Sequence, residues 1–485
     1  MVLGIIIIYL LVVLYIGYWG MKQTRDVEDY IVGGHRLGIL PSTGTYLATY
    51  LSAVSMLAGI GVVYNIGVAG AWFPIFYASG ALFGPIVAAR YRRVTFNTPP
   101  QFYAIRYDSR SLQVLAGIIT IIAVIFSLVV QFSAIGIVWS LATGGAFIHG
   151  LLIGSLVCLA YTLMGGYMAV VWTDVFQAVV FVAVTLIGGF WVLSKVGWIS
   201  GMYAGLSQVT APPVAGGVPP VPGTLVSALG PYVPLAIFFM MLPWLGGVAT
   251  HPQYLVRMQS AKDIKTALQK YAYSWVALCL IYFLFTSIGL GGRILVPTMP
   301  EGMTGDWIYP HLFMTYMPPV FTGLLFGGLL AAAMSTIDSQ MVLVAGCATI
   351  DIVKNFWPGT PERSLLWISR IMVSVVWALA FVFTTYKHPM LIAVAGLSWG
   401  LLAIGFFAPT LIGLYWKRVN ATSVWVSITS GLAVFLFWQF RFGTSVIGIP
   451  PVATGVFTGI VALVVATLAT RPAPENLWGP FFPDR

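Results

Sequence analysis

Thirteen long apolar stretches limit most strongly how this chain can fold. They lie near residues 2–20, 38–66, 70–90, 112–142, 147–164, 171–194, 231–250, 271–292, 319–352, 365–385, 389–416, 422–440 and 452–470. A helix of about 20 apolar residues crosses the hydrocarbon core of a membrane. Only 7% of the residues are charged, whereas a water-soluble domain carries about a quarter. We therefore predict an all-α polytopic membrane protein with about 13 transmembrane helices.

The basic residues indicate one orientation for these helices. If residue 1 lies outside, the outer side receives only four of the 23 Lys and Arg residues, namely Lys195, Arg293, Lys387 and Arg441. Basic residues concentrate on the cytoplasmic side of membrane proteins. We therefore place the protein in the cell (inner) membrane, with the N-terminus outside and, because the number of spans is odd, the C-terminus in the cytoplasm. This distribution explains the net charge of +10 without a nucleic-acid partner.

Two of the apolar stretches are interrupted. The stretch at 38–66 contains PSTGTYLATYLSAVSMLAGIG, and the one at 231–250 continues as MLPWLGGVATHPQ, where Pro243 removes a backbone donor. Interrupted helices at matching places in two halves are typical of inverted-repeat transporters, although glycine, serine and proline are also common in ordinary membrane helices. The transporter interpretation places core repeats at about 38–194 and 231–416, in a single domain at 1–470 followed by a short cytoplasmic tail at 471–485.

Two acidic residues lie inside apolar stretches, where an ionisable side chain is a functional candidate. Asp174, in VVWTDVFQAVV, has the alternatives of capping a helix end or pairing with a cytoplasmic arginine. Asp338, in AAAMSTIDSQM, could simply be satisfied by neighbouring hydroxyls. Ser335, Thr336 and Ser339 lie within about one helical turn, and their oxygens could bind an alkali cation or bond their own helix.

Enzyme chemistry has no support in the sequence. Cys158, Cys279 and Cys347 lack the spacing of a metal cluster or a disulfide framework. We find no nucleophile with a base and no glycine-rich phosphate loop. We therefore expect a protein that is not an enzyme and that uses no cofactor.

Five motifs together resemble the sodium:solute symporter family. In chain order they are ATYLSAVSMLAGIG, GGYMAVVWTDVFQA, HPQYLVRMQSAKDIKTA, AAAMSTIDSQM and FFAPTLIGLYWKRVNATS. The resemblance covers most of residues 1–470 and implies a leucine-transporter-type 5+5 inverted repeat with flanking helices, coupled to sodium. The first motif looks most similar to the pantothenate, acetate and monocarboxylate permease branch. Proline permeases carry an aspartate where this chain has Tyr50, and sugar transporters carry Glu-Gln where it has Val54 and Ser55.

The resemblance also implies ion sites. Carried over motif by motif, the shared sodium site consists of Ala48, Leu51, Ala332, Ser335 and Thr336. A second sodium, or an ion on its way to the cytoplasm, would meet Asp174, Asp338 and Ser339. An acid at position 338, in place of a hydroxyl, leaves the sodium stoichiometry open. No metal ion other than sodium is expected.

We expect the solute beside the two interruptions, in contact with Tyr50, Ser52, Ser55, Gln131, Trp244, Gly246 and Trp399. A small anion needs exposed amides at a helix start and a few hydroxyls, and Ser52, Ser55 and the backbone near Gly246 fit that need. An interhelical hydrogen bond is an equal alternative for Gln131. Packing is the alternative for the three aromatic residues.

The sequence thus predicts a sodium-coupled secondary active symporter that imports a small organic solute by alternating access. A carboxylate, either a short-chain monocarboxylate or pantothenate, is the expected solute. The alternatives are a proton-coupled or amino-acid (proline) carrier on the same fold, and a transporter-derived solute sensor. The expected partners are the solute, Na⁺ and the lipid bilayer, and we expect a monomer.

Overall fold

The computed structural model describes residues 1–209, 223–386, 391–442 and 449–482. These residues form helices and no strand, apart from one isolated bridge between Leu37 and Ala261. The α-helices are α1 (Val2–Met21), α2 (Val27–Val32), α3 (Ile39–Tyr50), α4 (Ile60–Ile66), α5 (Trp72–Tyr91), α6 (Gln101–Tyr107), α7 (Arg110–Thr143), α8 (Phe147–Lys195), α9 (Trp198–Ser207), α10 (Pro234–Met241), α11 (Gly247–Ala249), α12 (Pro252–Ser260), α13 (Ile264–Leu295), α14 (Ile308–Tyr316), α15 (Pro319–Gly346), α16 (Lys354–Phe356), α17 (Glu362–Thr385), α18 (Leu391–Phe407), α19 (Gly413–Tyr415), α20 (Ala421–Phe442), α21 (Pro451–Ala469) and α22 (Glu475–Trp478). Single π-helical turns occur at η2 (Val54–Gly59), η5 (Leu242–Gly246), η7 (Cys347–Val353) and η8 (Ala408–Ile412).

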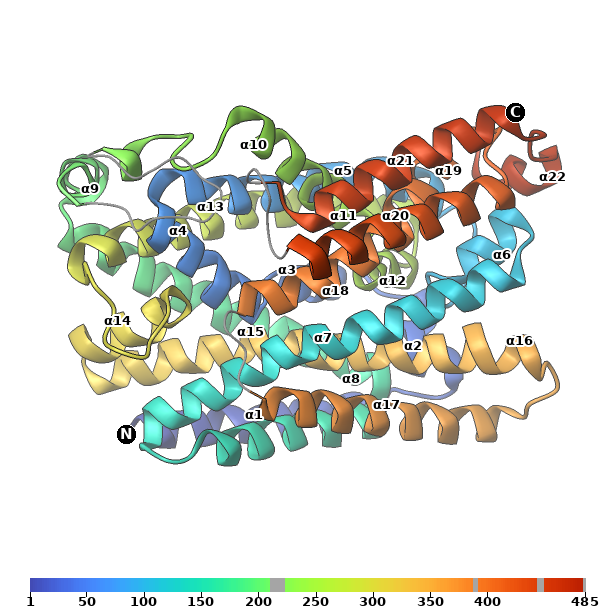
Figure 1. The fold of residues 1–485 in the computed structure, drawn as a ribbon. Coiled ribbons are helices and arrows are strands. Elements are labelled where there is room, and N and C mark those ends of the chain that lie inside the picture. The colour runs from blue at the N-terminus through green and yellow to red at the C-terminus, as the bar shows by residue number, and fades with distance from the viewer. Residues whose placement is uncertain (210–222, 387–390, 443–448, 483–485) are drawn as a thin grey trace.

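The long helices lie side by side, and the two chain ends lie at opposite ends of the bundle (Figure 1). Eleven helical segments are long and apolar enough to cross a membrane. One of them, α8, has 49 residues and would be about 74 Å long at 1.5 Å per residue, more than twice a hydrocarbon core of about 30 Å. Non-helical Gly166 (φ 54°, ψ −146°) divides α8, and Gly67 (φ 68°, ψ −142°) divides the segment Val54–Tyr91. The count of thirteen spans therefore stays a prediction, as does the division into two repeats.

Both predicted interruptions are present. Helix α3 ends at Tyr50, and extended Leu51 (φ −95°, ψ 102°) separates it from η2 and α4. The second interruption comes later than Pro243 suggested, because that proline lies within η5, whereas the chain becomes extended at His251 (φ −63°, ψ 132°). Pro252 then occupies the first turn of α12, where a missing N–H costs nothing.

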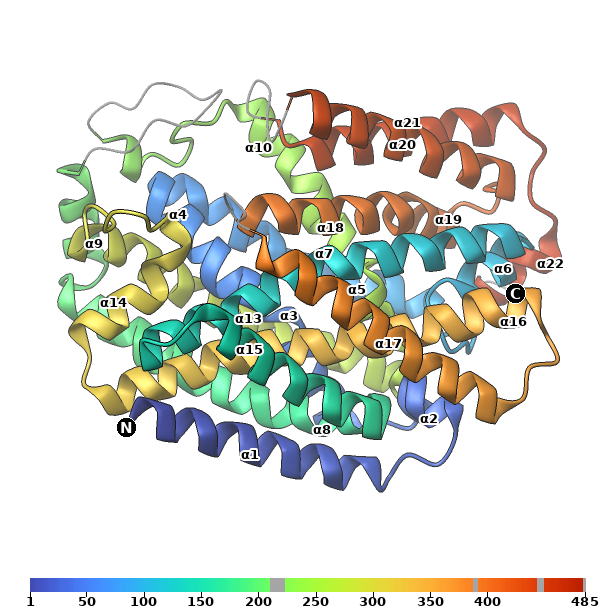
Figure 2. The same cartoon turned by 60° about the horizontal axis from the view of Figure 1, so that its bottom comes forward.

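Helix α15 is the central element of the bundle. Almost every side chain from Thr322 to Gly346 is buried, and α15 packs against α1, α3, α7, α8 and α17 (Figure 2). Helices α1 and α17 instead expose wide apolar faces, as lipid-facing helices do. The polar residues in the middle of α15 therefore lie deep in the protein, next to the break after α3.

Candidate functional site

The break after α3 meets the middle of α15. Ser335 Oγ donates a hydrogen bond to the Ala48 carbonyl at 3.0 Å, and Thr336 Oγ1 donates to the Ala332 carbonyl at 3.2 Å. The carbonyls at the end of α3 are available because the helix stops at Tyr50. Leu51 is the first extended residue of the break, and all five residues of the predicted sodium site are at most 3% exposed.

This cluster offers only neutral oxygens. Carbonyl and hydroxyl groups are the ligands that hard alkali cations prefer, and they hold such ions weakly enough to release them. The structure brings Ala48, Ala332, Ser335 and Thr336 into direct contact and places Leu51 beside them. The residues therefore fit a sodium ion.

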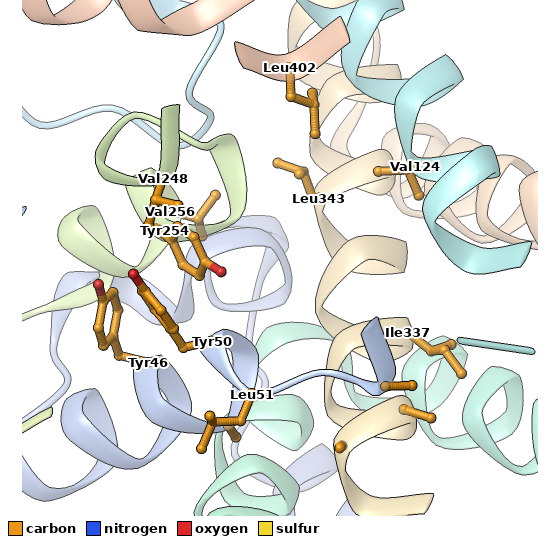
Figure 3. Packing of buried hydrophobic residues seen from close by; sticks show 14 of the residues in the cluster. Tyr46, Tyr50, Leu51, Val124, Val248, Tyr254, Val256, Ile337, Leu343 and Leu402 are labelled. Carbon is orange, nitrogen blue, oxygen red and sulfur yellow. The ribbon is translucent and has the colours of Figure 1, made fainter. Parts of the chain in front are cut away.

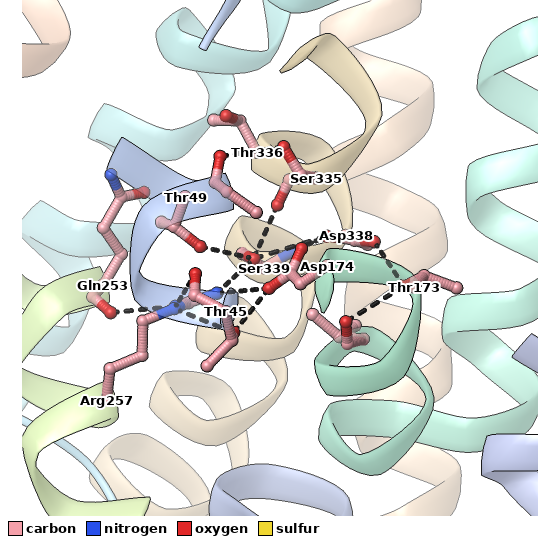
Figure 4. Close-up of polar contacts among 12 residues, drawn as sticks. Thr45, Thr49, Thr173, Asp174, Gln253, Arg257, Ser335, Thr336, Asp338 and Ser339 are labelled. Carbon is pink, nitrogen blue, oxygen red and sulfur yellow. Dashed lines mark hydrogen bonds and ion pairs between the residues drawn. The ribbon is translucent and has the colours of Figure 1, made fainter. Parts of the chain in front are cut away.

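A second cluster surrounds Arg257 on α12, which is 1% exposed. Its Nη2 atom lies 3.0 Å from Asp174 Oδ2 and donates to Ser339 Oγ at 2.6 Å. Its Nε atom donates to the Thr45 carbonyl at 3.0 Å, and Nη1 donates to the Gln253 carbonyl at 2.9 Å. Thr45 Oγ1 also donates to Asp174 at 2.5 Å. Arg257 thus links α12 to α3, α8 and α15 (Figure 4).

Asp338 lies on the far side of this second cluster. Its Oδ2 atom accepts hydrogen bonds from Tyr161 OH at 2.9 Å and from Thr173 Oγ1 at 3.4 Å. Its Oδ1 atom accepts from the Ser339 N–H at 2.6 Å. The geometry therefore shows the contacts of both simpler alternatives, an arginine partner for Asp174 and hydroxyl partners for Asp338. Their roles in ion binding stay predictions.

Two side chains hold the segment that follows the break. Gln131 Oε1 on α7 accepts a hydrogen bond from the Ala53 N–H at 3.1 Å. Ser55 Oγ lies 3.0 Å from Tyr282 OH on α13. Ser52 lies at the break itself, 7% exposed, and its carbonyl accepts from the Met56 N–H. Gln131 is therefore an interhelical partner that fixes the start of η2, next to the predicted solute position.

Aromatic rings cluster on one side of the break. The centroids of Trp244 and Trp399 are 5.2 Å apart, and the Tyr77 ring lies 5.9 Å from Trp244 and 5.4 Å from Trp399. Tyr50 OH donates to the Tyr77 carbonyl, so Tyr50 packs under these rings. Figure 3 shows Tyr46 and Tyr50 of α3 beside Tyr254 of α12. These rings are in mutual contact.

Gly246 takes no direct part in this ring cluster. A Cβ atom at position 246 would collide with the Phe407 ring, so the glycine permits close approach of η5 to α18. Its carbonyl lies 3.3 Å from Thr250 Oγ1. Its role in solute binding stays a prediction.

A buried acid outside the spans lies against α4, the half of the first interrupted helix that follows the break. Asp306 is 4% exposed, and its Oδ2 atom accepts a hydrogen bond from the Leu391 N–H at 3.3 Å, at the start of α18. Burial raises the pKa of this carboxyl, and the hydrogen bond from Leu391 opposes that rise. Asp306 thus ties the first residue of α18, the helix that carries Trp399, to the turn that contacts α4.

Sequence reasoning missed several residues of these clusters, among them Thr45, Tyr161 and Arg257. Arg257 was counted among the cytoplasmic cations, because it follows an interruption and stands near Lys262 and Lys265. Arg257 lies five residues after Pro252, in the run PQYLVRM directly after the second interruption, and this position was the available signal that it belongs to the second broken helix. Thr45 and Tyr161 carry no comparable signal, because they look like ordinary helix residues.

Fold and site together define a membrane transporter of the leucine-transporter-type fold. A Na⁺-coupled sialic acid symporter, solved in a substrate-bound outward-open state, superposes with a TM-score of 0.78 at 19% identity, covering 98% of this chain and 99% of that one. Mhp1, a nucleobase-cation-symport-1 family transporter, gives a TM-score of 0.53 at 14% identity, covering 92% and 97%. These likenesses show the predicted fold class.

The sequence model of the sodium:solute symporter family matches residues 30–431. The chain belongs to this family, as its motifs predicted, and sodium is the coupling ion of the family. Similar relatives are the osmoregulated proline transporter OpuE of Bacillus subtilis, 25% identical over 97% of this chain and 95% of the relative, and the high-affinity proline transporter PutP of the same organism, 27% identical over 88% and 89%. The sodium/proline symporter of Haemophilus influenzae is 24% identical over 97% and 95%.

These relatives correct the branch that the motifs suggested. The relatives that match along nearly the whole chain are proline transporters. The motif ATYLSAVSMLAGIG misled because it surrounds Ala48 and Leu51, at the break where the structure places the predicted sodium ligands. A motif in this position reports the ion site that a whole family shares, and it says little about the solute.

Proposed function

We propose that this protein is a sodium-driven symporter that imports a small zwitterion of the proline kind, a carboxylate joined to an ammonium group. The observation that carries the proposal is the ring cluster of Tyr77, Trp244 and Trp399 beside the break in the first interrupted helix. The faces of tryptophan and tyrosine rings attract ammonium groups. A zwitterion would use these faces for its positive end.

The negative end of such a solute would meet backbone amides. The helical run from Val54 to Ile66 starts directly after the break. Gln131 accepts from the Ala53 N–H and the Ser52 carbonyl accepts from the Met56 N–H, so the N–H groups of Val54 and Ser55 are the ones that a ligand would meet at this helix start. Partial positive charge at such a helix start favours a carboxylate. In the part of the chain that the structure describes, no lysine or arginine stacks on Tyr77, Trp244 or Trp399, since Arg257 and Lys270 stack on other tyrosines. This arrangement favours a zwitterion over a simple anion such as a monocarboxylate.

Reconstituted transport tests the proposal. Purified protein in liposomes is given labelled proline, acetate, pyruvate or pantothenate, with an inward gradient of sodium or of potassium. Proline uptake is expected with sodium only, and an excess of unlabelled acetate should not compete. Uptake of acetate, pyruvate or pantothenate in place of proline would reject the zwitterion, and uptake driven only by a proton gradient would reject sodium.

A substitution in the ring cluster sharpens the result. Replacing Trp244 by Leu removes one aromatic face, which is worth about 0.5–2 kcal/mol towards an ammonium group. The KM for proline should rise about twofold to thirtyfold, with sodium dependence retained. The matched control is Trp367→Leu on α17, where the ring is 57% exposed on the outer face of the bundle, and it should leave the KM unchanged.

We also propose that the end of the bundle bearing α6, α16 and α22 faces the cytoplasm. The basic residues Arg90, Arg92, Arg93, Lys354 and Lys417 lie at the ends of helices or in the turns near these elements. Positive charge favours the cytoplasmic side. A reporter fused after residue 485 should read as cytoplasmic, and an external reading would overturn this orientation.

A further inference from the structure

The segment after α21 folds back onto other helices instead of extending away from them. Phe481 is fully buried, and its ring meets the Phe102 ring of α6 edge-to-face with centroids 5.4 Å apart. The Ala473 N–H donates to the Arg418 carbonyl at 3.3 Å. Both views place α22 beside α6, at the end of the bundle where α19 lies (Figures 1 and 2). We call residues 471–482 the C-terminal strap.

Two arginines hold the inner end of the α18–α19 region beneath this strap. Arg90, in the last turn of α5, donates to the Leu414 carbonyl at 2.8 Å. Arg106 of α6 is fully buried and donates to the Gly413, Trp416 and Val419 carbonyls at 3.0–3.2 Å. Carbonyls at a helix end have no helical donor of their own. The two arginines therefore fasten the end of α19 to α5 and α6.

The strap covers this fastening. The Arg90 guanidinium lies 4.2 Å from the ring of Phe482 in the strap and 4.2 Å from the ring of Tyr415. Lys417 Nζ lies 4.5 Å from the Trp478 ring. Cations attract aromatic faces, most strongly where water is excluded. The strap thus places the Phe482 ring on Arg90 of α5 and the Trp478 ring on Lys417, which follows α19. In addition, its buried Phe481 packs against Phe102 of α6.

The end of α19 that Arg90 and Arg106 hold is connected through α18 to Trp399 of the ring cluster. Helix α18 carries Trp399, and it reaches α19 through the π-helical turn Ala408–Ile412, which contains Pro409. A proline and a π-helical turn weaken a helix at that point and allow it to bend. Movement of α19 away from α5 and α6 would therefore bend the chain at this turn, where α18 ends.

We propose that the C-terminal strap holds the inner end of α18–α19 against α5 and α6, and that it must release before the cytoplasmic half of the transporter opens. The inference goes beyond the proposed function. It needs a transporter that opens to each side in turn, and it does not depend on which solute is carried.

A reversible lock tests whether release is required. Phe102→Cys and Phe481→Cys are combined in a Cys279→Ser background, because Cys279 is the exposed native cysteine and the other two are buried. Oxidation that joins the two new cysteines should lower sodium-driven uptake of labelled proline in liposomes at least tenfold, and a reductant should restore it. The control is the Phe481→Cys single variant under the same oxidation. Full uptake by the cross-linked protein would overturn the proposal.

A second measurement needs no solute. Cys347 is fully buried at the start of η7, and four residues later Asp351 accepts a hydrogen bond at 2.6 Å from Thr98, just before α6. We expect Cys347 to react with a maleimide when the inner side opens in potassium medium, and to stay protected in the oxidised lock variant. Phe481→Ala should raise the rate about tenfold, as loss of a fully buried ring implies.

The matched control for that substitution is Phe440→Ala, which removes the same ring from a position that is 81% exposed. It should leave the reactivity of Cys347 unchanged. Equal reactivity in the locked and reduced proteins would reject the strap as a closing element. If proline is not the solute, uptake is absent from the reduced protein as well, while the Cys347 measurement still decides about the strap.

Discussion

Two buried clusters lie next to each other on α15, and they differ in charge. Ser335 and Thr336 meet the Ala48 and Ala332 carbonyls, and this cluster contains no ionisable side chain. One turn further along, Ser339 contacts the Arg257 guanidinium, which is paired with Asp174. The first cluster offers its oxygens to a cation that would bind from solution. The second cluster already contains a cation of the chain itself, the Arg257 guanidinium.

The difference indicates which cluster exchanges ions. Neutral oxygens can gain and lose a sodium ion at modest cost, as a coupling site must. A buried ion pair is costly to separate, because each partner would be left as an isolated charge. Arg257 also joins α3 and α12, which are one half of each interrupted helix, to α8 and α15. We therefore expect exchange at the neutral cluster, and closure of the inner side by the charged one.

The largest effect is expected from breaking the charged cluster. Arg257→Met leaves Asp174 buried without its cation, which costs about 3–5 kcal/mol. The free energy of unfolding should fall by that amount and uptake should be lost, as thermal unfolding in detergent and liposome transport would show. Removing both charges, in Arg257→Met with Asp174→Asn, should recover most of the stability.

A matched control separates this effect from the loss of any long side chain. Arg418 donates only to the carbonyls at the end of α21, and it pairs with no acid among the described residues. Arg418→Met should cost only about 1–3 kcal/mol, as expected for loss of hydrogen bonds from a charged donor. Equal losses in the two arginine variants would contradict a special role for the ion pair.

The next effect concerns the neutral cluster. Ser335→Ala combined with Thr336→Ala removes two of the proposed sodium ligands without disturbing a charge. The sodium concentration for half-maximal uptake should rise at least tenfold, while the unfolding temperature changes little. Thr120→Ala is the control, because Thr120 is a fully buried hydroxyl that bonds its own helix at 2.8 Å. An unchanged sodium requirement in the double variant would remove the site assignment.

A smaller effect tests the charge balance between the clusters. Asp174 pairs with the Arg257 guanidinium, whereas Asp338 contacts Tyr161 OH and the Ser339 N–H, so one negative charge remains near the proposed sodium site if both acids are ionised. Asp338→Asn removes that charge, and the sodium concentration for half-maximal uptake should rise roughly threefold to tenfold, equivalent to about 0.7–1.4 kcal/mol. An unchanged value would mean that Asp338 is neutral in the transporter.

The sequence predicted the neutral cluster better than the charged one, for a physical reason. The hydroxyl pair, the small residues around Ala48 and the break after α3 are local features, so a motif can indicate them, and the structure brings them into contact. The Arg257–Asp174 pair joins residues 83 positions apart, and the period of an apolar helix does not reveal which buried charges face each other. The solute was harder still to predict from the sequence, because the rings of Trp244, Trp399 and Tyr77 meet only after three separate helices have packed.

The smallest effect concerns the contact that joins the two clusters. Thr49 Oγ1 on α3 lies 3.3 Å from Ser339 Oγ, which is also the acceptor for Arg257. Thr49→Val keeps the shape of the side chain and removes its hydroxyl, so it should cost about 0.5–1.5 kcal/mol of hydrogen bonding. If this contact transmits sodium binding to the charged cluster, Thr49→Val alone should shift the sodium concentration for half-maximal uptake about twofold to tenfold. The shift caused by Thr49→Val should be smaller in the Arg257→Met, Asp174→Asn background, where the charges have been removed. Additive shifts in the combined variant would show that the two clusters act independently, and the neutral cluster would then respond to sodium without help from the charged one.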